Sequence, residues 1–232
     1  MKNTLQLLAS FCLVALMVSP VSAQKSKNAK SINEAHVVYK MSAEGGMAAA
    51  LEGSTMNIYF KPDRVKLLAN LMSGLVQMDI RIDNKAKKGV MLMDMMGQKK
   101  VIEMASEDLN KPKTNTKPSD EDIKYLNKYK KIAGYKCQEV QINMQGMDEP
   151  ATVYITEKIQ PQNMGEVSMM QFTGLKGFPL MWKIEQQGME ITMEAVEVST
   201  TKLPKDAFDM SIPDGYEKME MDDLKNMGGF GL

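Results

Sequence analysis

Methionine occupies alternate positions in residues 89–104, GVMLMDMMGQKKVIEM, and this stretch restricts the fold more than any other part of the chain. On a β-strand, side chains point alternately to opposite faces, so Met91, Met93 and Met95 would line one face. The opposite face is also apolar except at Asp94. A strand that is apolar on both faces is expected to be buried on both. Because methionine is flexible and polarisable, the stretch predicts an adaptable apolar interior.

The same two-residue alternation recurs along most of the chain. It is clearest in residues 76–83, VQMDIRID, and it returns in residues 178–184 and 189–195. About ten such segments are joined by short polar turns, which favours a single mainly β domain with little helix. Strands that follow one another through short connections pair in antiparallel order, so the prediction is an antiparallel meander.

Three local features predict departures from a plain meander. The apolar residues change parity at Gln138-Glu139 and again near Ala195-Val196. A strand that keeps one buried face across such a change needs an extra residue, so β-bulges are predicted at both places. Ser119, followed by acidic residues, is expected to cap a short helix that carries Ile123 and Leu126.

The ends of the sequence predict an exported protein. Residues 1–23 are interpreted as a signal peptide, with the apolar run Leu5–Val18 followed by cleavage after Ala23. That run is too short for a membrane span, and no later run approaches the roughly 20 apolar residues that a span needs. Phe11 precedes Cys12, where a lipid-attachment site requires a small residue, so lipidation is not expected.

The rest of the chain is divided by composition. Residues 24–31 are interpreted as a disordered linker, residues 32–219 as the folded domain and residues 220–232 as a flexible tail. The expected location is the periplasm or the extracellular space. A formal net charge of +0 argues against nucleic acid and against an electrostatic membrane hold.

The chain lacks the residue patterns of an enzyme. His36 is the only histidine, and there is no Gly-rich phosphate loop, GxSxG or HExxH motif. Cleavage after Ala23 would leave Cys137 as the only cysteine, which is interpreted as a small buried residue. No enzymatic activity, cofactor or metal is therefore predicted. Copper binding by the thioethers of residues 91–96 is a weaker alternative, because methionine suits Cu(I) but here is spread over the whole chain.

Several short motifs resemble one family of exported proteins. They are Ile132-Ala133-Gly134-Tyr135-Lys136-Cys137, residues 203–208, LPKDAF, and residues 212–216, IPDGY. With the signal peptide and the strand pattern, they are similar to a secreted domain-of-unknown-function family of Gram-negative bacteria, related to the lipoprotein-localisation-factor (LolA/LolB-like) superfamily. The resemblance implies a curved antiparallel sheet that forms an unclosed β-barrel, with short helices or loops covering its mouth. The candidate covers are residues 43–54 and 160–177.

The resemblance and the methionine pattern together suggest what the protein does. The resemblance implies a lipid or lipoprotein acyl chain as partner, so the prediction is a non-enzymatic module that holds an apolar ligand against a concave sheet. The alternative is a structural or protein-interaction domain of the cell envelope, in which the same side chains close on one another. The wall residues expected from the alternation are Val76, Met78, Ile80, Met91, Met93, Met95, Trp182, Ile184, Ile191 and Met193. The expected flap residues are Met164, Met169, Met170 and Phe172.

Overall fold

The strands account for most of the described chain in the computed structural model. The structure describes residues 31–45, 48–105, 118–144, 147, 149–162, 174–186 and 188–226. The predicted signal peptide lies outside these residues. The strands are β1 (Ala35–Glu44), β2 (Thr55–Lys61), β3 (Arg64–Leu71), β4 (Val76–Asp83), β5 (Lys88–Met95), β6 (Gln98–Met104), β7 (Ile123–Ile132), β8 (Tyr135–Ile142), β9 (Ala151–Thr156), β10 (Phe178–Gln186), β11 (Met189–Ser199) and β12 (Glu217–Lys218).

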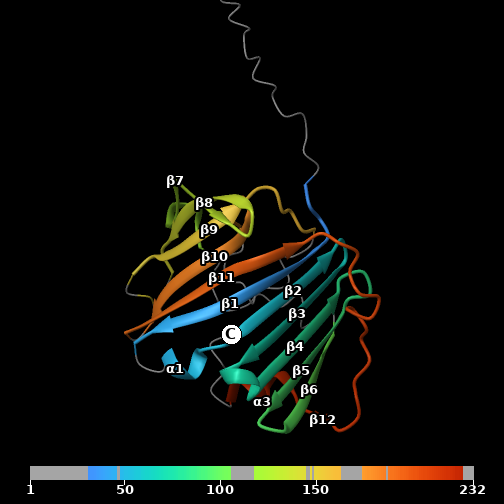
Figure 1. Ribbon diagram of the computed structural model, residues 1–232. Coiled ribbons are helices and arrows are strands. Elements are labelled where there is room, and N and C mark those ends of the chain that lie inside the picture. The colour runs from blue at the N-terminus through green and yellow to red at the C-terminus, as the bar shows by residue number, and fades with distance from the viewer. Residues whose placement is uncertain are drawn as a thin grey trace, which may run out of the picture.

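The strands form one large curved sheet made of two meanders (Figure 1). Its order is β12-β6-β5-β4-β3-β2-β1-β11-β10-β9-β8-β7, so β1–β6 and β7–β11 each follow the sequence. The two meanders join where β1 pairs with β11. All pairs are antiparallel except β12 with β6. The order ends at β12 and β7, so the described sheet is unclosed, and the predicted mainly β fold class is confirmed.

Helices are short. Those among the described residues are α1 (Ala48–Leu51) and α3 (Met221–Asn226), with the 3-10 turns η1 (Met72–Gly74) and η2 (Asp120–Asp122). The helical turn α1 falls within residues 43–54, one of the two expected covers. In the described part of the chain, neither helix approaches the length that a bilayer crossing requires.

The register breaks lie in the second meander and at its junction with the first. Val38 pairs with Glu197 but Tyr39 pairs with Ala195, so Val196 is an extra residue, and the bulge predicted there is confirmed. The bulge predicted at Gln138-Glu139 is wrong, since β8 pairs with β9 without a break from Gln138 to Ile142. The extra residues lie on the facing strand, between Tyr125 and Tyr129 of β7.

The predicted helix after Ser119 is also wrong beyond its first turn. Ser119 and Asp122 form a reciprocal capping box around η2, and the chain then enters β7 at Ile123. The cap lies where the sequence predicts it, but it serves a single 3-10 turn. The sequence of β7, IKYLNKYKKI, is mostly charged or polar, so its strand character is not visible as an alternation of apolar residues.

The segment after β11 forms a strap, residues 203–216, across the outer face of the first meander. Leu203, Ala207 and Phe208 pack beside Tyr59 of β2. Further along, the strap places Met210 and Tyr216 against a second cluster of β5 and β6 side chains, which are Val90, Leu92 and Val101. The first meander is therefore covered on its outer face as well as its inner one, as the two-sided apolar character of β5 predicts.

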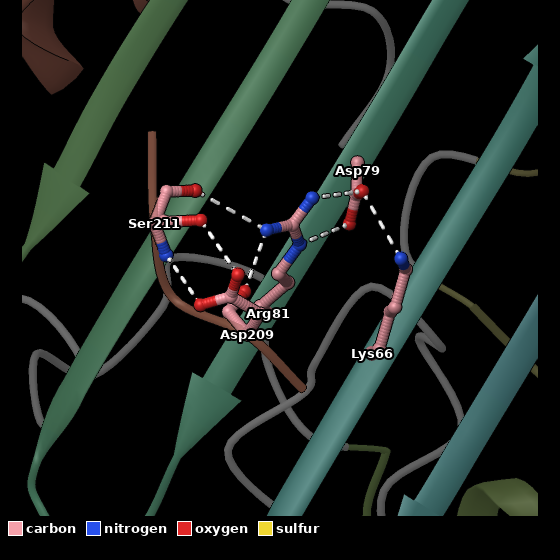
Figure 2. A network of polar contacts seen from close by, with 5 residues as sticks. All are labelled: Lys66, Asp79, Arg81, Asp209 and Ser211. Atoms are coloured by element: carbon pink, nitrogen blue, oxygen red, sulfur yellow. Dashed lines mark hydrogen bonds and ion pairs between the residues drawn. The ribbon is translucent and has the colours of Figure 1, made fainter. Parts of the chain in front are cut away.

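One arginine anchors the strap (Figure 2). Arg81 of β4 binds Asp79 through two nitrogens, at 3.0 and 2.7 Å, and donates to the carbonyl oxygens of Asp209 and Ser211 at 2.5 and 3.3 Å. Lys66 of β3 lies 3.2 Å from the same Asp79 carboxylate. The hydrogen bond to Asp79 raises the pKa of Arg81. A fixed guanidinium fork thus ties the sheet to strap carbonyl groups.

The first residues of the predicted flexible tail, 220–232, form structure in the described part of the chain. After the strap, β12 adds to the edge of β6, and Met219 donates its amide to the carbonyl of Val101 at 2.9 Å. The chain then forms α3, and Leu224 is buried in the main core. Residues 227–232 lie outside the described part. The C-terminal segment therefore runs from the outer face, around the β6 edge, to the inner apolar core.

Candidate functional site

The strand register brings the predicted wall residues onto one face of the sheet. On β4 and β5, Val76 faces Met95, and the two pairs that follow along the strands are Met78 with Met93 and Ile80 with Met91. On β10 and β11, Trp182 faces Met193 and Ile184 faces Ile191. Directly opposed residues share a face. The two groups lie three strands apart, separated by β3, β2 and β1.

The intervening strands continue the same apolar face. Met78 of β4 faces Ala69 of β3, Ala69 faces Met56 of β2, and Met56 faces Tyr39 of β1. Most of these side chains belong to the single main core cluster. The face is therefore one continuous apolar surface inside the curved sheet.

Six of the ten predicted wall residues are buried, five of them within this core cluster. Met93 is 2% exposed, and its neighbours Met78 and Met91 are similarly buried. The remaining buried members are Val76, Ile80 and Met193. Side chains so enclosed contact other protein atoms in place of solvent, so they fill the interior. A ligand would reach them only by displacing the packing.

The other four remain half-buried. Ile184 and Ile191 lie near the β10–β11 turn, Met95 ends β5, and Trp182 lies at the middle of β10. Met41 of β1 faces Met193, which in turn faces Trp182, so the partly accessible apolar residues continue onto β1. We call the half-buried band the set Met41, Met56, Leu71, Met95, Trp182, Ile184 and Ile191, all of which are partly accessible.

Tyr39 lies beneath the half-buried band and is fixed in place by its contacts. This side chain is fully buried, and its hydroxyl donates to the carbonyl oxygen of Pro179 at 2.8 Å. Burial raises the pKa of Tyr39 well above its ordinary value, so the phenol stays protonated and keeps donating. The Trp182 ring lies 5.3 Å from the Tyr39 ring at an interplanar angle of 55°. A tilted aromatic pair of this kind fixes the indole beside the accessible edge of the core.

The reverse side of the same strand ends is charged. Glu190 of β11 faces Glu44 on one neighbour and Glu185 on the other. Lys183 forms an ion pair with Glu190, and this hydrogen bond, helped by the nearby carboxylates, raises the pKa of Lys183. The strand ends therefore separate an apolar inner surface from a solvated outer one.

Sequence reasoning missed part of the band. Met41 and Met56 alternate correctly in the sequence, yet nothing local shows that β1 and β2 lie between the two predicted walls. The predicted flap residues Met164, Met169, Met170 and Phe172 lie outside the described residues. The flap therefore stays a prediction.

Reactive side chains outside the band are held in structural contacts. His36 stacks on Tyr59 at 4.0 Å, and its Nε2 lies 2.9 Å from Asn57 Oδ1. Cys137 is buried, as expected, and burial raises the pKa of its thiol to about 11. Within the described ranges, no group of three His, Cys, Asp or Glu residues is arranged to hold a metal ion.

The family of the chain follows from its sequence over most of the sheet. A model of the domain of unknown function DUF4412 matches residues 34–216, from the start of β1 to the end of the strap. The chain belongs to the DUF4412 family. The matched region contains every member of the half-buried band. A comparison with curated proteins finds no match.

Solved structures show distant likeness to this DUF4412 chain. One crystal form of PNGF-II has a TM-score of 0.49 and 15% identity, and covers 84% of this chain but 33% of its own. A second crystal form of PNGF-II has a TM-score of 0.47 and 16% identity, and covers 84% of this chain and 32% of its own. This chain thus spans about a third of PNGF-II. The Mycobacterium tuberculosis lipoprotein LppX has a TM-score of 0.39 and 8% identity, with coverage of 74% of this chain and 89% of that one. At these levels no property is transferred.

Proposed function

We propose that this protein is a non-enzymatic binding module that holds an apolar chain, of the kind found in lipids, against the half-buried band. The observation that carries the proposal is the change in burial along one continuous face. Met78, Met91 and Met93 are enclosed, whereas Trp182, Ile184 and Ile191 on the same face remain partly accessible. An accessible apolar surface that continues a packed core gains free energy when hydrocarbon covers it.

The size of that gain suits a lipid-like ligand. Each methylene removed from water contributes about 0.8 kcal/mol, so about six would contribute roughly 5 kcal/mol before ordering costs. Methionine side chains at Met41, Met56 and Met95 adapt to ligands of varied shape at little cost in strain. The charged outer side, with Lys183 and Glu190, leaves the inner side as the surface suited to hydrocarbon.

A structural or protein-interaction role is the second candidate, and one observation favours it. Six predicted wall residues are buried, which reduces the apolar surface available to a small ligand. In this reading the half-buried band is the margin of a core whose packing needs no ligand. Copper binding has less support, because Met91 and Met93 are enclosed in the core.

The proposal also includes export and the absence of catalysis. Residues 1–23 have the composition of a signal peptide, and Cys137 and His36 are engaged in packing. Mass spectrometry of the mature protein is expected to find an amino terminus at Gln24. A mature terminus at Cys12 carrying diacylglycerol would contradict this part and would make the protein membrane-anchored.

Native mass spectrometry of the protein, as purified and after delipidation, tests the ligand. Co-purifying lipid, or recovered binding of a fluorescent fatty acid after delipidation, is expected. No bound lipid and no fatty-acid binding would refute the binding module and leave the structural role. Met93→Asp is unsuitable as the loss-of-binding variant, because a charge at this enclosed position would strongly destabilise the core.

A further inference from the structure

We propose that the outer edge of β7 binds an extended acidic peptide segment of a partner protein by strand addition. β7 is the last strand of the sheet and pairs only with β8 (Figure 1). In the described part of the chain, no other strand pairs with its second edge. The backbone N–H and C=O groups along such an edge are a template for another strand.

The charge on this strand selects the partner. The ten residues of β7, IKYLNKYKKI, contain four lysines and no acidic residue, in a chain whose formal net charge is +0. Lys128 is 68% exposed and lies 3.6 Å from Glu139. Among the described residues, no carboxylate pairs with Lys124 or Lys131. Positive charge is thus concentrated and only partly neutralised at the one long free edge.

The same charge disfavours a second copy of this chain as the occupant. Antiparallel pairing of two β7 edges would bring lysines of one copy close to lysines of the other, and like charges across a ladder destabilise it. Lysine on an edge strand is a common protection against self-association. A strand that carries glutamate or aspartate would meet the same lysines as opposite charges.

The strand is held in place for such a role. Lys130 reaches from β7 to Glu194 of β11 at 3.0 Å, so the β7–β8 hairpin bends over the sheet towards a strand four positions away. The Lys136 ammonium lies 3.8 Å from the Tyr129 ring centre. On the facing strand, Gln138 donates to the carbonyl of Leu126, which lies within the break in the β7–β8 ladder. These contacts reduce the ordering cost of docking, because the edge is already fixed.

The partner surface is separate from the half-buried band, so the inference does not depend on the proposed ligand. The test measures fluorescence anisotropy of labelled peptides of about eight residues with the full mature chain at low ionic strength. The probes are a Glu-Thr repeat, a Lys-Thr repeat and a Glu-Pro repeat. This third peptide repeats Glu-Glu-Pro-Pro, so it keeps the glutamates of the Glu-Thr peptide but places proline on both edges of an extended strand. Either edge then lacks half of the amide donors that a ladder needs.

The Glu-Thr peptide is expected to bind at least about tenfold more tightly than either other peptide. Lys124→Glu with Lys131→Glu is expected to weaken that binding about tenfold. The matched control, Lys85→Glu with Lys202→Glu, changes exposed lysines elsewhere and is expected to stay within about twofold. Hydrogen exchange should show new protection on β7.

Three results would overturn the inference. Equal binding of the Glu-Pro peptide would show a charged surface without strand addition. An unchanged affinity in the Lys124→Glu, Lys131→Glu variant, folded by circular dichroism, would place the peptide elsewhere. Self-association of the unliganded chain through protected β7 amides would make a second copy the occupant.

Discussion

The two meanders of the sheet are built from the same alternating strands but differ in regularity. Ladders from β1 to β6 run without a register break, and the strap covers their outer face. In the second meander, the ladders break between Tyr125 and Tyr129 and between Pro179 and Met181, and the junction with β1 breaks at Val196. Bulges increase local twist and bend. The first meander is therefore a regular scaffold that is apolar on both faces, whereas the second supplies the local bends. The half-buried band takes residues from both meanders.

The largest expected effect contrasts two methionines of the first meander. Met93 is 2% exposed and Met96, three residues later, is 78% exposed. Met93→Asp should lower the free energy of unfolding by about 4 kcal/mol or more, because it buries a carboxylate without a partner. Met96→Asp should change it by less than about 0.5 kcal/mol, because the side chain is in solvent. Urea unfolding measures both, and similar losses would contradict the packed interior of this meander.

A smaller effect tests the strap. Arg81→Ala should lower the free energy of unfolding by about 2 kcal/mol, since it removes charged hydrogen bonds from a side chain that is 12% exposed. Residues 203–216 should also become sensitive to protease. Arg64→Ala is the matched control, because its ion pair with Asp83 is 43% exposed on the arginine side. An unchanged cleavage pattern in Arg81→Ala would show that apolar contacts alone hold the strap.

The smallest effect is the pH dependence of the same strap. Hydrogen bonds from Ser211 lower the pKa of Asp209, and the hydrogen bond with Lys100 lowers the pKa of Glu217. A carboxylate whose pKa is lower in the folded than in the unfolded chain stabilises the fold at pH values above the unfolded pKa, which is near 4. This stabilisation is lost as the pH falls through the lower, folded pKa.

Amide exchange, corrected for intrinsic rates, should therefore show β12 and the end of the strap loosening below about pH 4 before β9 does. The β9 strand has no carboxylate of its own, so it is an internal reference. Asp209→Asn should reduce the difference in pH at which the strap and β9 begin to loosen. Simultaneous loosening of β9 and the strap in the native chain would place the acid-sensitive contacts elsewhere.

The local sequence predicts the first meander better than the second. Residues 76–83 and 89–95 alternate cleanly, and their strands pair in the expected hairpin. The parity change at Ala195-Val196 located a real bulge because both flanking segments are apolar. At β7 the lysines hide the strand period, and the extra residues lie on that strand instead of on β8.

Local sequence patterns do not predict the pairing of strands that lie far apart in the sequence. The β1–β11 pairing joins residues about 150 positions apart, for which no turn or spacing provides a signal. This junction brings Met41 beside Met193 and Trp182, so the half-buried band depends on it. The alternation identified the apolar face, whereas only the register showed which part of that face is enclosed.

Trp182 provides the most direct test of the binding site, because it is the only tryptophan and lies in the half-buried band. Titration with a brominated fatty acid should quench Trp182 fluorescence in the delipidated chain. Ile191→Glu, in the same band, should weaken quenching about tenfold or more, since a charge replaces apolar contact. Val196→Glu, on the same strand at a 48% exposed position, should leave it unchanged. Fatty acid that binds without quenching Trp182, or quenching that Ile191→Glu does not weaken, would contradict the proposed site.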